Sequence, residues 1–475
     1  MDWLGPGIPD RLTAARPTVL WVELTSRCVL DCLFCTRRER WGSGRDMDLA
    51  LYRRLMQDLD QPEMIRLNYS GESLLYPQLA AAIELAAETG ACTELVTALP
   101  RVSDETIRQL ARSRLQRLTV SLHTLDSAQY ARVYGTGQLA SALNQLQRLI
   151  RLRAAQKGGG PNLDLCMVAM RENLSQMEPL AAFAVQAGIS RLNVLPVIAR
   201  GRQRADFAWE HRDSCPTPPF REELLARAAQ AAAGHPETEL TVDLPAGAEA
   251  ADATEQNALR EGMRIASCPQ NPWNTTHVLA NGDLVPCEVQ DDRPMGSLAG
   301  GSLEEAWHSR EYRRFRKDYW LARDPRCRAC PWKTVYDPGA GRAGISAPAG
   351  RAQLLHGWYT EEKGQAVWSR PKALLVLAGN RHRPVLRLAG ILPFVSGPEA
   401  NRLSILCNGH CVGEVRQPDP EQPGFERRFP LPRSRRSEWL LEFSVRHRFR
   451  PSRYGPSKDH RDLGFALIQA SLTER

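Results

Sequence analysis

Between residues 18 and 234 the chain alternates short apolar runs with segments of helical periodicity. The apolar runs predict six β-strands, TVLWVEL, MIRLNYS, CTELVTAL, LQRLTVSL, LDLCMVAM and RLNVLPV. Segments between them, such as MDLALYRRLMQDL and SQMEPLAAFAVQAG, carry apolar residues at helical spacing. This alternation predicts right-handed crossovers and a parallel sheet, hence an α/β fold that is either an open doubly wound sheet or an incomplete barrel. In both folds the active site lies at the carboxyl ends of the strands.

Beyond residue 234 the pattern changes twice. A strand, ELTVDLP, and a loop of small residues come first, followed by a cysteine-containing region that extends to residue 336. The Gly/Pro/Ala-rich segment 337–350 predicts a linker. After it, KALLVLAG, RLSILCNGHCVGEV and EWLLEFSV predict strands joined by turns, so we expect an all-β sandwich there. The predicted domains are therefore 1–234, 235–336 and 351–475.

Composition narrows the class of protein. A chain of 475 residues exceeds one ordinary core. No apolar run reaches the length of a membrane helix, and the N-terminus MDWLGPGIPDRL lacks the features of a signal peptide. We therefore expect a cytoplasmic protein, in which twelve reduced cysteines indicate metal binding or catalysis before disulfides. The net charge of +8 is modest, and we infer no nucleic-acid binding from it.

Three of these cysteines, Cys28, Cys32 and Cys35, follow the first predicted strand within the segment ELTSRCVLDCLFCTRR. A tetrahedral zinc ion or a cubic iron–sulfur cluster held by protein alone needs four ligands, so three thiolates leave one position open. The alternative is half a zinc site that another residue completes.

With Phe34 before the last cysteine, the Cys-x3-Cys-x2-Cys spacing resembles the signature of the radical S-adenosylmethionine (SAM) enzymes. The resemblance implies a partial (β/α)6 barrel and a [4Fe–4S] cluster on the three thiolates, with SAM at the open iron. It also implies reductive cleavage of SAM to a 5′-deoxyadenosyl radical that abstracts a hydrogen atom. An external electron donor of the flavodoxin or ferredoxin type would then be needed.

The resemblance extends to further segments. NYSGESLLYP is similar to the family's Gly-Gly-Glu segment, with Ser70 in place of the first glycine and Gly71 and Glu72 retained, which implies contacts to the amino group of SAM. The resemblance similarly implies polar contacts to SAM for Ser121 and Asn173. It implies apolar contacts for Leu195 and Pro196 beside the adenine, and it places Phe34 among the cofactor-binding residues. His123 is a candidate substrate contact or proton carrier, with a structural histidine as the alternative.

A second cysteine set consists of Cys268, Cys287, Cys327 and Cys330. It resembles the auxiliary-cluster extension known as SPASM, in its shorter twitch form. The resemblance implies a small auxiliary domain with a second [4Fe–4S] cluster, which four protein ligands would suit to electron transfer. Four cysteines would satisfy a structural zinc ribbon equally well.

Cys215, in HRDSCPTPPF, follows the sixth predicted strand. A thiol in that loop could donate a hydrogen atom to a substrate radical, and an inert loop cysteine is the alternative. The segment ILCNGHC predicts a β-turn between two strands in place of a metal site.

The C-terminal segments LLHGWYTEEKGQAVWSRPKALLVL and KDHRDLGFALIQASL resemble a β-rich domain appended to bacterial glycosyltransferases and other surface-polysaccharide enzymes. The resemblance implies a saccharide or glycoside substrate. Trp358, Tyr359 and Trp368 could stack on sugar faces, or could instead anchor the sandwich core. The leading hypothesis is thus a radical SAM epimerase or dehydrogenase that acts on a saccharide carbinol carbon.

Two alternatives stay open. A peptide-modifying maturase of the SPASM type would use the same cofactors on an encoded peptide. About seventeen residues precede the first predicted strand, which is short for a peptide-binding N-terminal domain. A zinc-binding scaffold in polysaccharide assembly is the alternative that is not an enzyme.

Overall fold

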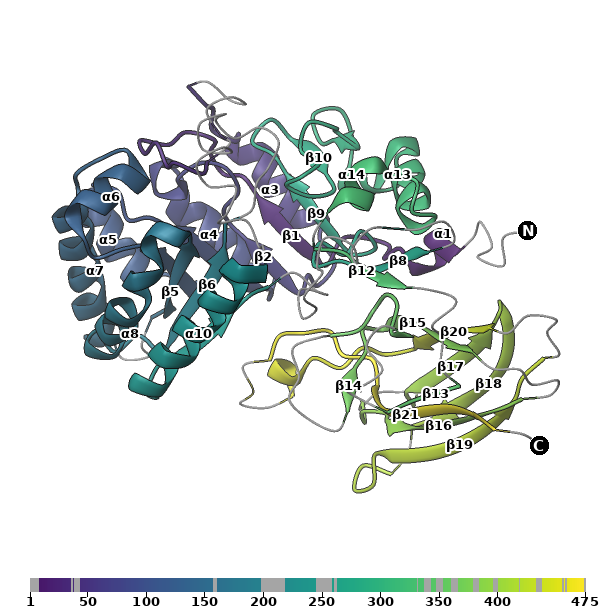
Figure 1. Cartoon of the computed structure of the whole chain (residues 1–475). Helices are drawn as coiled ribbons and strands as arrows, with labels where there is room; N and C mark the ends of the chain where they lie inside the picture. The colour runs from purple at the N-terminus through teal and green to yellow at the C-terminus, as the bar shows by residue number, and fades with distance from the viewer. Residues whose placement is uncertain are drawn as a thin grey trace. The chain divides into compact units, whose positions relative to one another are not determined.

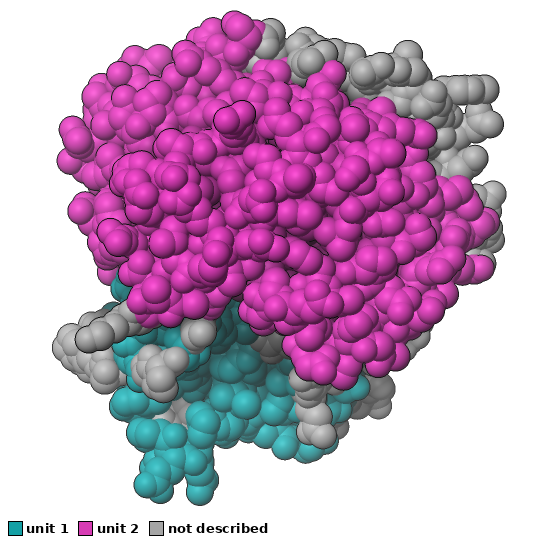
Figure 2. Space-filling model, turned by 90° about the vertical axis from the view of Figure 1, so that its left-hand side faces the viewer, with its two compact units in different colours: residues 1–14, 256–273, 313–475 teal, residues 15–255, 274–312 magenta. Residues whose placement is uncertain are grey.

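The chain divides into two compact units, which Figure 2 colours separately. Unit 1 consists of residues 1–14, 256–273 and 313–475, and unit 2 of residues 15–255 and 274–312. The computed structural model describes residues 8–35, 37, 43–156, 160–197, 218–244, 259, 263–330, 332–336, 343–346, 353–359, 366–378, 384–395, 400–417, 419–432, 438–454, 457 and 459–473. The domain boundaries expected from the sequence remain predictions.

Unit 2 is built on a ten-stranded sheet with the order β11-β10-β9-β1-β2-β3-β4-β5-β6-β7 (Figure 1). The six strands expected from the apolar runs are all present, and β7 extends them in parallel. Their bounds are β1 Val19–Val22, β2 Met64–Arg66, β3 Cys92–Thr97, β4 Arg117–Ser121, β5 Asn162–Ala169, β6 Arg191–Pro196 and β7 Glu239–Val242. The parallel α/β fold is confirmed.

On the other side of β1 the sheet takes strands from a distant part of the sequence. β9 (Thr275–Val278) pairs in parallel with β1, and β10 (Asp283–Val285) and β11 (Gly296–Ser297) follow in antiparallel order. All four residues of β9 are buried, so this segment lacks the alternation of a half-buried strand.

The crossover helices follow the strands in the expected order: α3 Leu49–Asp58, α4 Leu79–Glu88, α5 Asp104–Arg112, α6 Ser127–Tyr134, α7 Leu139–Ala154, α8 Met177–Gln186 and α10 Pro218–Gly234. Short polar side chains begin several of them. Asp48, Ser103 and Asp126 each accept a hydrogen bond from a backbone N–H in the first turn of α3, α5 and α6. Among the described residues no helix is long and apolar enough to cross a membrane.

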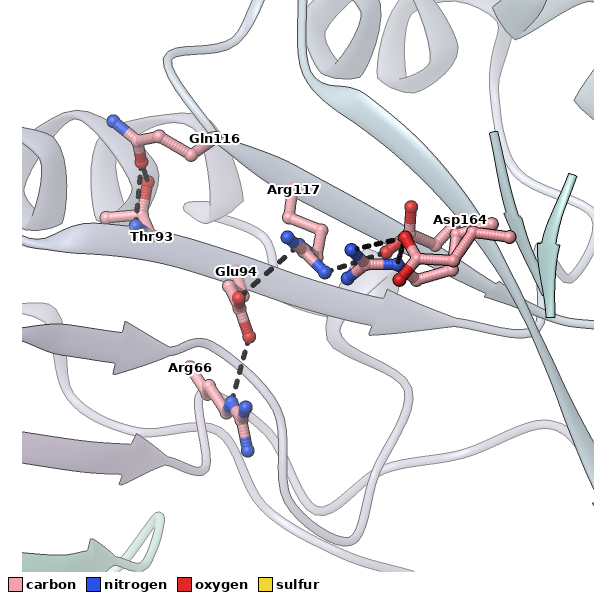
Figure 3. A network of polar contacts seen from close by, with 8 residues as sticks. Arg66, Thr93, Glu94, Gln116, Arg117 and Asp164 are labelled. Carbon is pink, nitrogen blue, oxygen red and sulfur yellow. Dashed lines mark hydrogen bonds and ion pairs between the residues drawn. The ribbon is translucent and has the colours of Figure 1, made fainter. Parts of the chain in front are cut away.

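The face of the sheet away from the helices carries a row of alternating charges. Ile65, Leu95 and Leu118 are fully buried, so their strand neighbours Arg66, Glu94 and Arg117 point to the opposite face. Glu94 accepts from Arg66 Nε at 2.9 Å and lies 3.5 Å from Arg117 Nε (Figure 3). The row, which we call the charge belt, consists of Arg66, Glu94, Arg117, Asp164, Arg191 and Glu239.

The C-terminal part of unit 1 is a pair of antiparallel sheets. One has the order β13-β21-β16-β19, with β14 also on β21, and the other the order β15-β20-β17-β18. The bounds are β13 Gly344–Ser346, β14 Val367–Trp368, β15 Lys372–Ala378, β16 Val385–Ile391, β17 Arg402–Cys407, β18 His410–Arg416, β19 Gly424–Pro430, β20 Glu438–Val445 and β21 Ala466–Thr473. Apolar side chains from both sheets form one core. This agrees with the predicted all-β module.

Two details of that module bear on the sequence predictions. The turn between β17 and β18 places Asn408 at φ +49° and Gly409 at φ +84°, as an Asn-Gly hairpin turn requires, so the predicted β-turn is confirmed. β13 lies inside the stretch expected to be a linker and pairs with β21. The remainder of unit 1 includes α1 (Ile8–Leu12), the pair β8 (Arg264–Ser267) and β12 (Thr334–Tyr336), and α14 (Pro325–Ala329).

We expect Glu94→Ala to destabilise the strands that the charge belt joins, since Arg66 and Arg117 would lose their shared partner in a partly buried setting. The expected loss is about 1–3 kcal/mol, less than for a fully buried pair. Hydrogen exchange of the β2–β4 amides would measure it. Glu84→Ala is the control because the Glu84–Arg114 pair is solvent-exposed on both sides. Equal protection of these amides in the two variants would contradict a structural role for the belt.

Candidate functional site

The loop that carries Cys28, Cys32 and Cys35 follows β1 and is tied to the end of α6. The backbone N–H of Asp31 donates to Tyr134 O at 3.0 Å, and that of Leu33 donates to Val133 O at 2.9 Å. Gly135 ends α6 at φ +69°, where a Cβ would lie 2.7 Å from Asp31 Cβ. Glycine therefore meets two demands here, the left-handed backbone and the close approach of the cysteine loop.

The environment of Cys28 and Cys32 disfavours the charged forms of these two thiols. Burial raises the pKa of Cys28, and burial followed by the nearby charges of Cys35 and Cys28 raises that of Cys32 well above its ordinary value. The buried Arg37, missed by the sequence analysis, acts against this at Cys28 and donates to Ser26 O at 3.2 Å. Neighbouring, partly buried thiolates such as those of Cys28 and Cys32 need a cationic partner, which iron would supply.

The described thiols are not arranged for a single ion. In the part of the chain that the structure describes, no three His, Cys, Asp or Glu side chains converge to hold one metal ion. An iron–sulfur cluster takes its thiolates at separate iron atoms and needs no such point. The thiols of Cys28 and Cys35 are near enough to that of Cys32 for their charges to act on it, and three neighbouring thiols are a donor set that such a cluster can use.

Gly71 brings the loop after β2 into contact with the start of the cysteine loop. A Cβ on Gly71 would overlap the carbonyl oxygen of Thr25 and lie 2.7 Å from that of Arg27. The next N–H, that of Glu72, donates to Arg27 O at 2.8 Å. Only glycine permits this approach, so the two loops are held as one surface.

The carboxylate of Glu72 joins the ends of β2 and β3. It is 4% exposed and accepts from Thr97 Oγ1 at 2.8 Å, Ala98 N at 3.0 Å and Leu74 N at 3.2 Å. Burial raises its pKa although these three hydrogen bonds favour the charged form. Three of about four acceptor positions of the carboxylate are therefore filled by protein donors.

Ser70, which departs from the family's glycine, has a partner of its own. Its hydroxyl donates to Glu23, a fully buried carboxylate at the end of β1. Glu23 also accepts from Ala280 N at 2.9 Å. The serine thus helps to connect the loop after β2 with β1 and with the segment after β9.

Asn173 and His123 are both engaged within the protein. The amide of Asn173 accepts from Met170 N at 2.7 Å and donates to His123 O and Val168 O at 3.1 and 2.9 Å, so it joins the ends of β4 and β5. The His123 ring accepts from Val168 N through Nδ1 and stacks on Tyr134 at 5.0 Å. Burial lowers its pKa to about 3, which leaves it neutral at physiological pH and favours the structural alternative.

The remaining predicted contacts lie at the same edge of the sheet. The Phe34 ring meets His123 edge-on at 5.4 Å, and Ser121 ends β4 with its carbonyl accepting from the Tyr134 hydroxyl. Leu195 and Pro196 end β6. The structure thus gathers these residues with the cysteine loop, as carboxyl ends of parallel strands must meet. Cys215 lies outside the described residues.

The second cysteine set is distributed over both units. Cys287 follows β10 in unit 2. In unit 1, Cys268 follows β8, and Cys327 and Cys330 lie on and after α14, whose N-cap Asp324 accepts from Cys327 N at 2.9 Å. Burial raises the pKa of Cys268 to about 12, although hydrogen bonding to Tyr319 acts against it. Tyr319 is a further residue that the sequence analysis missed.

We expect Gly71→Ala to separate the two loops, because the added methyl group overlaps backbone atoms that cannot move independently. The expected cost is about 1–3 kcal/mol, with reduced iron content. Urea unfolding and iron analysis after anaerobic reconstitution would measure both. Gly137→Ala is the matched control, since a Cβ there meets nothing within 4 Å. Wild-type iron content and stability in Gly71→Ala would refute the constraint.

Two family profiles match this chain. The profile of the radical SAM superfamily matches residues 22–184, which include Cys28, Cys32 and Cys35. The SPASM profile, described as an iron–sulfur cluster-binding domain, matches residues 268–331, which begin at Cys268 and include Cys287, Cys327 and Cys330.

Two characterised proteins are similar to this chain in sequence. PqqA peptide cyclase of Xanthomonas campestris pv. campestris is 25% identical over 351 residues, 72% of this chain and 86% of that protein. A tungsten-containing aldehyde ferredoxin oxidoreductase cofactor-modifying protein of Pyrococcus furiosus is 24% identical over 184 residues, which cover 38% and 52%.

Solved structures share the fold. Streptococcus suis SuiB bound to the precursor peptide SuiA has a TM-score of 0.52 at 14% identity, over 65% of this chain and 68% of that one. SuiB bound to SAM has a TM-score of 0.50 at 14% identity, over 67% and 73%. The two domains imply a [4Fe–4S] cluster used with SAM and an auxiliary iron–sulfur cluster. The chain therefore contains a radical SAM domain and an iron–sulfur cluster-binding domain of the SPASM type.

Proposed function

We propose that this enzyme modifies a peptide. The observation that carries the proposal is the similarity to PqqA peptide cyclase. It spans 72% of this chain and 86% of that protein, so it is not confined to a single domain. The name of that relative gives a peptide as the molecule acted on. This was the alternative hypothesis of the sequence analysis, and the shortness of the segment before β1 did not exclude it.

The saccharide hypothesis is wrong, and with it the epimerase or dehydrogenase assignment. It depended on the C-terminal module alone, whereas the relatives with the greater coverage are named peptide cyclases. Two of the three aromatic residues considered for sugar stacking, Trp358 and Tyr359, are also engaged within the protein. The Trp358 indole donates to Leu374 O at 2.6 Å and its ring packs on Phe443 and Phe465, so it anchors the core.

Tyr359 is similarly enclosed. The guanidinium groups of Arg370 and Arg461 lie 4.5 and 4.9 Å from the centre of its ring, and its hydroxyl donates to Asp462 O. A ring held between two cations has little face left for stacking on a sugar. The physical basis of the saccharide hypothesis therefore fails at both residues.

For the first cofactor we propose Cys28, Cys32 and Cys35 as ligands. When bound and reduced, that cluster supplies the electron that cleaves SAM and so starts hydrogen abstraction. The residues of the chain hold the surroundings in place. Gly71 lets two backbone segments meet beside the thiols, and Glu72, Ser70 and Asn173 fix the strand ends.

We expect the three-cysteine variant, with Cys28, Cys32 and Cys35 all changed to Ala, to lose about half of the bound iron, because a second cluster remains. Iron analysis and the visible spectrum of the reconstituted protein would measure this loss. Cys411→Ala is the control, as this thiol is exposed on β18 and distant in sequence from both sets. Full iron retention in the three-cysteine variant, or zinc in place of iron in the wild type, would contradict the assignment.

We also expect 5′-deoxyadenosine production to rise when the anaerobic enzyme, SAM and dithionite receive short peptides encoded near its gene. Mass spectrometry should find a peptide of changed mass or configuration. Cys32→Ala should abolish both signals because it removes one cluster ligand. Stimulation by a saccharide pool, with no response to any peptide, would overturn the proposed substrate class.

A further inference from the structure

Unit 1 contains a cluster of four rings from separate segments, of which Tyr319 adjoins the Cys268 thiol. Trp273 follows β8, whereas Tyr319 and Trp320 lie at the end of α13 (Arg310–Trp320). The fourth ring is His356, from the C-terminal module. Its ring centre lies 5.2 Å from that of Trp273, 5.5 Å from Tyr319 and 5.7 Å from Trp320.

The four rings are at most 3% exposed, and three of them carry a polar atom without a hydrogen-bond partner in the described part of the chain. These atoms are the Trp273 and Trp320 indole nitrogens and His356 Nε2, whereas the Tyr319 hydroxyl interacts with the Cys268 thiol. Buried polar groups are nearly always hydrogen-bonded. Three such atoms in one cluster favour a bound group that supplies their partners.

The cluster is adjacent to the thiols. The Tyr319 hydroxyl and the Cys268 thiol shift one another's pKa, and the charges of Cys327 and Cys330 also act on Tyr319. Lys333 lies on the same side. It is 3% exposed, its ammonium group donates to Cys330 O at 3.0 Å, and the charges of Cys330 and Cys327 reach it.

The sandwich holds His356 rigidly. Leu355 N donates to Leu374 O at 2.9 Å, and Leu374 N donates to His356 O at 2.8 Å, so the segment pairs with β15. Gly357 follows at φ +84°, where a Cβ would overlap Lys372 O. The backbone of His356 is thus fixed by the all-β module, and its imidazole also hydrogen-bonds to the backbone of Ile265 in β8.

We propose that Tyr319 and Lys333 are outer-sphere partners of the auxiliary iron–sulfur cluster, and that His356 positions the Tyr319 ring. Tyr319 would supply a hydrogen-bond donor to cluster sulfur, and Lys333 a positive charge. Both stabilise the more negative, reduced cluster and therefore raise its reduction potential. The C-terminal module, through His356, sets the electronic environment of the cluster. The inference rests on the proposed ligand role of Cys268, Cys327 and Cys330.

The test is a potentiometric titration followed by electron paramagnetic resonance. It uses the full chain with Cys28, Cys32 and Cys35 changed to Ala, so that only the auxiliary cluster gives a signal. In this background Tyr319→Phe removes one hydroxyl, and Lys333→Met removes one charge. Each should shift the midpoint to more negative values, by about 59 mV for a tenfold change in the reduced-to-oxidised ratio. Tyr454→Phe, at an exposed tyrosine of the C-terminal module, should leave the midpoint potential unchanged.

His356 requires two variants. His356→Ala should shift the midpoint in the same direction, and His356→Phe should shift it less than His356→Ala, because a ring at this position still packs against Tyr319. Unchanged midpoints in Tyr319→Phe, Lys333→Met and His356→Ala, with full iron content, would overturn the outer-sphere proposal. Absence of iron from the three-cysteine background would instead show that the ligand assignment fails, and the outer-sphere roles with it.

Discussion

The site depends on the close approach of two loops, made where Gly71 meets the backbone between Thr25 and Arg27. A parallel sheet brings the carboxyl ends of its strands to one edge, but it does not by itself bring the loops into contact. The missing Cβ of Gly71 does so, and the Glu72 N–H then bonds to Arg27 O. This contact adds to the bonds that tie the cysteine loop to α6 and to the segment at Arg45 and Asp46.

Buried polar side chains form hydrogen bonds with backbone groups that the sheet leaves unpaired at its strand ends. Strand ends present backbone N–H and C=O groups that no neighbouring strand takes up. Glu23, Glu72 and Asn173 accept from or donate to such groups at the ends of β9, β3, β4 and β5. These side chains hold the loops in position before any cofactor binds, so less ordering remains for the binding step.

Local patterns predicted local features. The six strands from β1 to β6 and the Asn408–Gly409 turn follow from periodicity and from turn chemistry that lie within a few residues. The parallel pairing of β9 with β1 and the pairing of β13 with β21 depend on contacts between distant segments, which no short pattern encodes. Cys28, Cys32 and Cys35 were recognisable by spacing. Tyr319 and His356 were not recognisable, because a single tyrosine or histidine forms no motif with a defined spacing. Their role depends on neighbours that only folding brings together.

The charge belt has a consequence for how molecules reach the sheet. Its three arginines alternate with three carboxylates, Glu94, Asp164 and Glu239, so neighbouring fields cancel within a few ångströms. A surface of this kind exerts little long-range pull on an ion of either sign. The belt itself therefore adds little to the ionic-strength dependence of binding at this face, and any such dependence must come from other charges of the chain, whose net charge is +8. Within the belt, selection between molecules must depend on shape and hydrogen bonding.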